Sequence, residues 1–130
     1  MKQTTNDWFM AANDDLFAAK KLVTENQLTN IVAFHCQQCI EKCFKAVLEE
    51  KGLPPLKSHD LIRLQLNADI QLTKTETILL ATINEVYIDA RYPGDLGLLP
   101  MGKPTIAEAE TFISFSEQLF NQMKQALIDK

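Results

Sequence analysis

The chain has 130 residues, 46% hydrophobic and 23% charged, which is the composition of one globular domain. Thirteen basic against seventeen acidic residues give a net charge of −4, which argues against nucleic-acid binding through a broad basic surface; no DNA-binding signature is present. No apolar run approaches the ~20 residues of a membrane span, and the polar N-terminus does not resemble a secretory signal, so we expect a cytoplasmic protein.

Apolar residues spaced three and four apart predict helices throughout, and no segment alternates for long enough to predict a strand. The first predicted helix covers residues 6–24, with Thr5 or Asn6 as its N-terminal cap. The second covers residues 30–51 and ends at Gly52, a residue suited to the left-handed conformation at a helix C-terminus. A pair of prolines then imposes a stiff, non-helical connection.

Ser58 is expected to cap a short third helix over residues 58–66, and a fourth helix follows over residues 73–90. Residues 91–104, rich in proline and glycine, form the long irregular segment of the chain. The sequence TIAE, a capping box, then opens the last helix. The predicted fold is all-α: a single domain over 1–130 forming an antiparallel four-helix bundle with an additional short helix.

The second predicted helix has a broad apolar face that contains Cys36, Cys39 and Cys43. Their spacing could in principle direct three thiols at one ion, but no second Cys or His cluster completes a tetrahedral site. We therefore interpret them as packing residues and expect neither a metal nor a cofactor. Gln37 lies within the same apolar arc, so its amide needs a hydrogen-bonding partner.

The segment FHCQQCIEKCFKA resembles the hallmark helix of HEPN domains (higher eukaryotes and prokaryotes nucleotide-binding), whose pattern is F-H-x-Q-Q-x-x-E-K-x-x-K-A. An A-x-x-D-L-x-x-A match begins upstream at Ala12, and SHDL and ARYP follow from Ser58 and Ala90. The resemblance covers nearly the whole chain and implies a helical bundle that forms a homodimer. It also suggests a minimal nucleotidyltransferase as partner protein, as in toxin–antitoxin or modification pairs, with nucleotide or RNA as further candidate ligands.

Some HEPN families are metal-independent endoribonucleases, marked by an arginine followed after four to six residues by a histidine. Neither Arg63 nor Arg91 has such a histidine, so the usual nuclease site is absent. Our first hypothesis is therefore a non-catalytic HEPN module. The alternatives are an atypical ribonuclease that uses Arg91 with His59 or Tyr92, and a self-associating structural bundle.

Each candidate residue also has a structural interpretation. Arg91 complements the end of a helix and could pair with Asp15 or a nearer aspartate, and His59 could meet Asp60 or a backbone carbonyl. The polar helix face is either solvated or a contact surface, which an exposed Phe34 among paired charges favours. The candidate ligand- or partner-binding residues are Arg91, Tyr92, His59, Asp60, Gln38, Lys42 and Lys45, and the candidate dimer or packing residues are Phe34, His35, Gln37 and Glu41.

Overall fold

The computed structural model describes the backbone of residues 1–91 and 103–129, and within these residues it contains helices and no strand. The all-α fold class is therefore confirmed. The elements in chain order are α1 (Gln3–Leu22), a short 3₁₀ helix η1 (Asn26–Leu28), α2 (Thr29–Glu50), α3 (Leu61–Asn67), α4 (Lys74–Arg91) and α5 (Ile106–Ile128). None of the described helices is both long and apolar enough to cross a lipid bilayer.

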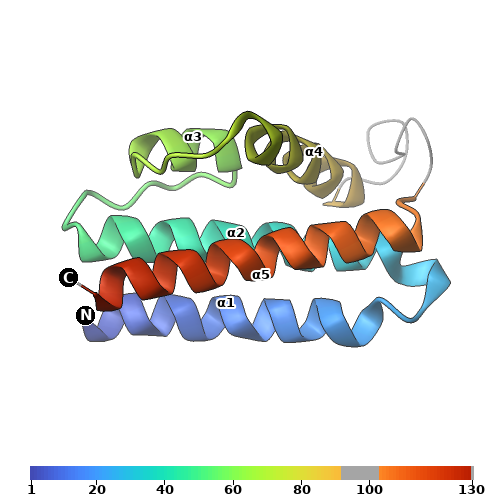
Figure 1. Cartoon of the computed structure of the whole chain (residues 1–130), viewed down its shortest axis with the longest axis horizontal. Helices are drawn as coiled ribbons and strands as arrows, with labels where there is room; N and C mark the ends of the chain where they lie inside the picture. Colours follow the sequence, from blue (N-terminus) through green and yellow to red (C-terminus); the bar gives the residue numbers. More distant parts are fainter. Residues whose placement is uncertain (92–102, 130) are drawn as a thin grey trace.

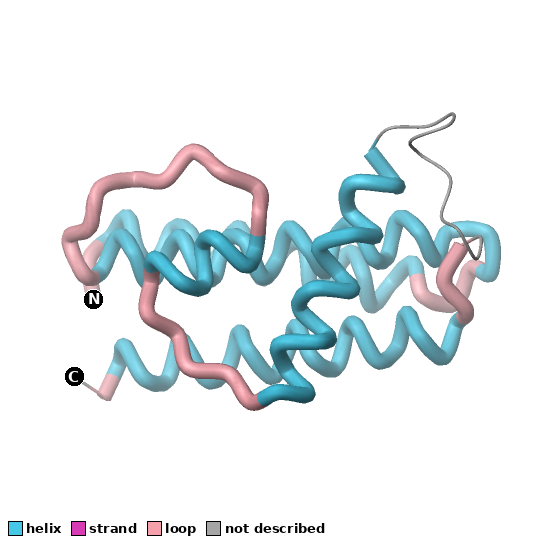
Figure 2. The backbone as a smooth tube through the Cα atoms, turned by 90° about the horizontal axis from the view of Figure 1, so that it is seen from above, coloured by secondary structure: helices cyan, strands magenta, loops and turns pink. Residues whose placement is uncertain are grey.

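The three long helices α1, α2 and α5 lie side by side, and α3 and α4 form a second layer over them (Figure 1). Helix α1 runs opposite to α2, whereas α2 and α5 run in the same direction (Figure 1). Seen from above, α4 crosses the long helices obliquely (Figure 2). Helices α2 and α5 can run in the same direction because the chain returns across the bundle between them, through the segment after α2 and through α3 and α4.

Helix α2 is the centre of the core, since it packs against α1, α3, α4 and α5. This explains why its apolar face is wider than one stripe. Cys36, Cys39 and Cys43 are fully buried there, which confirms their predicted packing role. Burial raises the pKa of the Cys36 thiol to about 12 and the pKa of the Cys43 thiol well above its ordinary value.

Two predicted helix starts are wrong. Helix α1 begins at Gln3, and Thr5 lies inside it, buried, with its hydroxyl donating to Glu50 at 2.9 Å; neither Thr5 nor Asn6 caps it. Helix α3 begins after Asp60, whose carboxylate accepts from the Ile62 backbone N–H at 3.0 Å, so Asp60 and not Ser58 is the cap. The Thr5 hydroxyl is engaged by Glu50 of α2, and the Ser58 hydroxyl accepts from the neighbouring Asp60 backbone N–H.

Two other predicted helix ends are confirmed. Gly52 follows α2 with a φ of +69°, the left-handed conformation expected at a helix C-terminus. At the start of α5, the Thr105 hydroxyl accepts from the Glu108 N–H at 3.0 Å, and the Glu108 carboxylate accepts from the Thr105 N–H at 2.9 Å. Both features depend only on neighbouring residues, which is why the sequence alone predicted them.

Candidate functional site

The polar face of α2 meets side chains from three other segments, and together they form what we call the α2 surface. Helix α1 contributes one acidic residue, the segment before α3 contributes a histidine, and α4 contributes a tyrosine. The α2 surface consists of Phe34, His35, Gln38, Glu41, Lys42 and Lys45 of α2 with Asp15, His59 and Tyr87.

Asp15 joins α1 to the α2 surface through two charged contacts. One carboxylate oxygen lies 2.9 Å from Nδ1 of His35, and the other accepts from Nζ of Lys42 at 2.5 Å. The Asp15 residue is only 9% exposed, so these contacts replace most of the water that its charge would otherwise bind. The pairing of Asp15 with Arg91 that the sequence suggested falls on a side chain outside the described residues.

Glu41 is the second acidic centre, and it is 3% exposed although its position on α2 suggested a solvated face. Its carboxylate accepts from Nζ of Lys45 at 2.9 Å and lies 2.9 Å from Nδ1 of His59. Burial by itself would raise the pKa of Glu41, but the hydrogen bonds and charges of Lys45 and His59 outweigh it, so the net pKa is lowered. Glu41 is therefore a buried carboxylate that stays ionised near neutral pH.

The amide of Gln37 has the partner that its buried position requires. Its Nε2 donates to the backbone oxygen of His59 at 2.8 Å and to Glu41 at 3.3 Å. Its Oε1 accepts from Gln38 at 2.7 Å. Gln37 thus fastens the segment before α3 onto α2, and this is how His59 reaches Glu41.

Four rings lie in a row across the α2 surface. The Phe34 ring stacks on Tyr87 with centroids 5.6 Å apart and an interplanar angle of 25°. His35 meets Phe34 edge-on at 5.5 Å, and His59 lies 5.9 Å from Tyr87. Phe34 is half-buried, so the prediction of an exposed aromatic is wrong, because α4 crosses over it.

The charges of the α2 surface balance when the histidines are neutral. Two lysines, Lys42 and Lys45, face two carboxylates, Asp15 and Glu41. The His59 side chain is 54% exposed while its Nδ1 bonds to Glu41, which is the geometry that holds an imidazole in one orientation.

Other predicted site residues lie apart from this network. Asp60 caps α3 and accepts a hydrogen bond from the Asn84 side chain at 3.1 Å, so it ties α3 to α4. The His59 ring contacts Glu41 instead of Asp60. Arg91 is the last residue of α4, but its side chain and all of Tyr92 lie outside the described residues. Within the described residues, no group of three or more His, Cys, Asp or Glu is arranged to hold a metal ion.

The sequence analysis did not name three residues of this region as site members, namely Asp15, Tyr87 and Trp8. Asp15 had a usable signal, because a charged residue lies on a stripe of buried apolar residues in α1 and therefore needs a partner. Trp8 has its ring 5.6 Å from Nζ of Lys45, in a cation–π contact. That contact had no signal in the sequence, since it depends on how α1 and α2 are placed side by side.

The comparisons with known proteins agree with this geometry. The HEPN domain family model matches residues 5–126. Among solved structures, ST0689, an archaeal HEPN homologue, has a TM-score of 0.72 at 21% identity over 98% of this chain and 99% of its own. TT1696 from Thermus thermophilus has a TM-score of 0.75 at 16% identity over 95% of this chain and 98% of its own. The search of curated proteins found no match.

The family model covers almost the whole chain, so the chain belongs to the HEPN domain family. The two solved structures, each under 25% identical, establish that the fold is shared. The HEPN resemblance noted from the sequence is thereby confirmed as family membership.

Proposed function

We propose that this protein is a non-catalytic HEPN module that forms a homodimer and binds a partner protein through the α2 surface. The observation that carries the proposal is that both lysines of this surface are held by buried carboxylates on α1 and α2. Such side chains are already ordered, so a partner that binds them loses little additional side-chain entropy.

The charge balance favours a protein partner over a polyanion. RNA or DNA binding depends on cations whose charge is free to replace counterions. On the α2 surface the Lys42 ammonium is engaged by Asp15 at 2.5 Å and the Lys45 ammonium by Glu41 at 2.9 Å. A surface with ordered, compensated charges and half-buried rings instead suits a protein interface.

The family resemblance suggests a minimal nucleotidyltransferase as the partner, and we adopt that class in the proposal. Nucleotide or RNA is a further candidate ligand.

The proposal can be tested on the native protein with one surface variant and one matched control. Lys42→Gln removes a cation of the α2 surface, and Lys74→Gln removes an exposed cation at the far end of α4 from Tyr87. We expect light scattering to give twice the 14.7 kDa chain mass for the wild type. We expect affinity capture from the host to retain a nucleotidyltransferase with wild type and Lys74→Gln, but much less with Lys42→Gln.

Recovery of a monomer that retains neither a transferase nor a nucleotide would contradict the proposal. Circular dichroism of both variants distinguishes a lost contact from a lost fold. A dimer that forms normally but is indifferent to host lysate, nucleotide and RNA would instead support the purely structural alternative.

The His59–Glu41 pair favours a second candidate function, an atypical metal-independent ribonuclease. A buried carboxylate that orients an exposed imidazole is an arrangement that supports general acid–base chemistry. The second imidazole nitrogen of His59 could then take the proton of a ribose 2′-hydroxyl, with Arg91 as the candidate phosphate ligand. RNA cleavage in excess chelator by wild type, but not by His59→Ala or Arg91→Ala, would establish this activity and overturn the non-catalytic proposal.

A further inference from the structure

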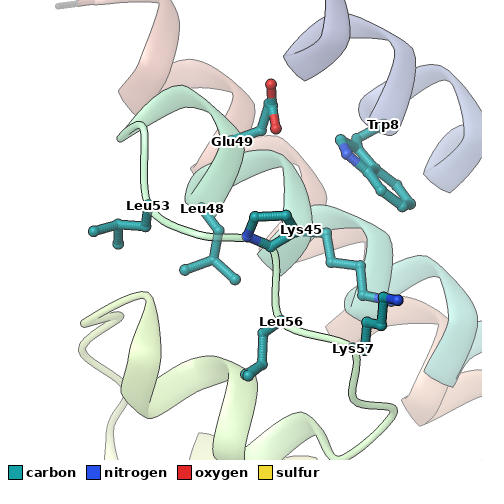
Figure 3. Close-up of a pocket in the computed structure, with 8 residues that line it drawn as sticks. Trp8, Lys45, Leu48, Glu49, Leu53, Leu56 and Lys57 are labelled. Atoms are coloured by element: carbon teal, nitrogen blue, oxygen red, sulfur yellow. The ribbon is translucent and has the colours of Figure 1, made fainter.

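A pocket of about 250 Å³ lies between α1, the end of α2 and the segment that follows α2 (Figure 3). It adjoins the α2 surface through one shared residue, Lys45, and otherwise uses residues that the proposed function does not. Its lining consists of Trp8 from α1, Lys45, Leu48 and Glu49 from α2, and Leu53, Pro55, Leu56 and Lys57 from the following segment.

The pocket exists because of how the chain leaves α2. Gly52 takes the left-handed conformation, and the Leu53 N–H donates back to the Leu48 oxygen at 3.0 Å, which turns the chain sharply. Pro54 and Pro55 then hold the next residues extended, away from the α2 helix. The segment therefore arches past α2, and the hollow beneath it is left open between α2 and α1 (Figure 3).

The walls of the pocket are largely apolar. Leu48 is buried in the core, and Trp8 and Leu56 are half-buried and pack against the core from the pocket side. Leu53 is 40% exposed, an apolar side chain at the pocket's edge that a ligand could cover. The volume exceeds the roughly 150 Å³ that accommodates benzene in an apolar cavity, and lies just under the range for drug-sized ligands. The space therefore fits one aromatic ring with a short side chain.

The charged side chains that line the pocket are Lys45, Lys57 and Glu49, and the Lys45 charge is paired with Glu41. Glu49 already accepts a hydrogen bond from the Thr4 hydroxyl at 2.7 Å. Lys57 is exposed and has no ion pair among the described residues. Lys45 bonds to Glu41 through one of its three N–H groups, so its ammonium retains donors for a second anion. In Figure 3 both lysine side chains end on the side of the pocket opposite Leu53.

We propose that this pocket is a binding site for a small aryl carboxylate. The ring lies against Trp8 and the leucines, and the carboxylate is bound by Lys57 with Lys45 as a second donor. The site is additional to the proposed function of the α2 surface and does not depend on it. For a ligand of about twelve heavy atoms, an affinity on the order of 1 mM or tighter is expected.

Trp8 is the single tryptophan of the chain, so its fluorescence reports on this pocket specifically. Titration of the native protein with 4-phenylbutyrate is expected to change Trp8 emission to saturation. Lys57→Gln, which alters an exposed side chain, should weaken binding at least fivefold, and Leu53→Ser should also weaken it. The remote control Lys74→Gln should bind like the wild type.

Two further ligands separate the contributions of ring and charge. The neutral 4-phenylbutanamide should bind at least fivefold more weakly than the acid, and inorganic phosphate should leave Trp8 emission unchanged. Equal binding of amide and acid, or no saturable change with the acid in the millimolar range, would overturn the proposal. So would a change in Trp8 emission that only a partner protein produces, since the pocket would then belong to a protein interface.

Discussion

The buried carboxylate of Glu41 gives the sharpest test of the α2 surface as described. Glu41→Gln keeps the size and shape of the side chain but removes the negative charge that Lys45 and His59 contact at 2.9 Å each. Removing one partner of a buried ion pair usually costs about 3–5 kcal/mol. Lys45 and His59 keep some contact with water, with side chains 18% and 54% exposed, so they can be rehydrated in part. We therefore expect a loss of about 2–3 kcal/mol in the free energy of unfolding.

The measurement is urea unfolding at pH 7, followed by circular dichroism at the helical bands. With an m value of about 1.5–2 kcal/mol/M, the expected loss lowers the urea midpoint by about 1–2 M. The matched control is Glu110→Gln, a change at an exposed residue of α5, which should stay within about 0.5 kcal/mol of the wild type. A loss below about 1 kcal/mol for Glu41→Gln would refute the inference that Glu41 organises this region.

Three further predictions follow from the same structure. Because the pKa of Glu41 is lowered, the stabilisation by its carboxylate is complete above pH 4.5 and is lost as the pH falls through the folded-state pKa. The difference in urea midpoint between the wild type and Glu41→Gln should therefore shrink from pH 6 to pH 3. An unchanged difference would contradict the lowered pKa. Burial raises the pKa of the Cys36 thiol to about 12 and the pKa of the Cys43 thiol well above its ordinary value. Both thiols should therefore resist an aromatic disulfide reagent at pH 8 in the folded protein and react with it in urea. Fast reaction of the native protein would count against this packing. Asp60→Ala removes the α3 cap and the contact with Asn84. It should lower the free energy of unfolding by about 1 kcal/mol, measured by thermal or urea unfolding. A stability equal to that of the wild type would mean that the cap contributes little.

The HEPN hallmark helix was predictable because its information is local. Apolar spacing in α2 placed its cysteines on the buried face, and the structure buries all three fully. The same locality explains the confirmed Gly52 terminus and the Thr105 capping box. The need of Gln37 for a partner also followed from its position, although which group would supply it did not.

The candidate site was only partly predictable, because its contacts join residues far apart in the chain. Glu41 looks solvated on a helical projection, yet the segment carrying His59 folds over it and leaves it 3% exposed. Phe34 looks exposed for the same reason, yet Tyr87 of the crossing helix α4 stacks on it. Helix α1 begins earlier than predicted because Thr5 lies against Glu50 at the far end of α2.

By itself, the sequence determined the helical class, most helix positions, the buried cysteines and the HEPN family resemblance. Each of these depends on periodicity or on residues within a few positions of one another. Only the tertiary structure decided that α4 crosses the long helices, that Asp15 and Glu41 order two lysines and two histidines, and that a pocket opens beside Trp8. Those features arise where segments separated by many residues meet, and a helical pattern carries no information about the angle or register of that meeting.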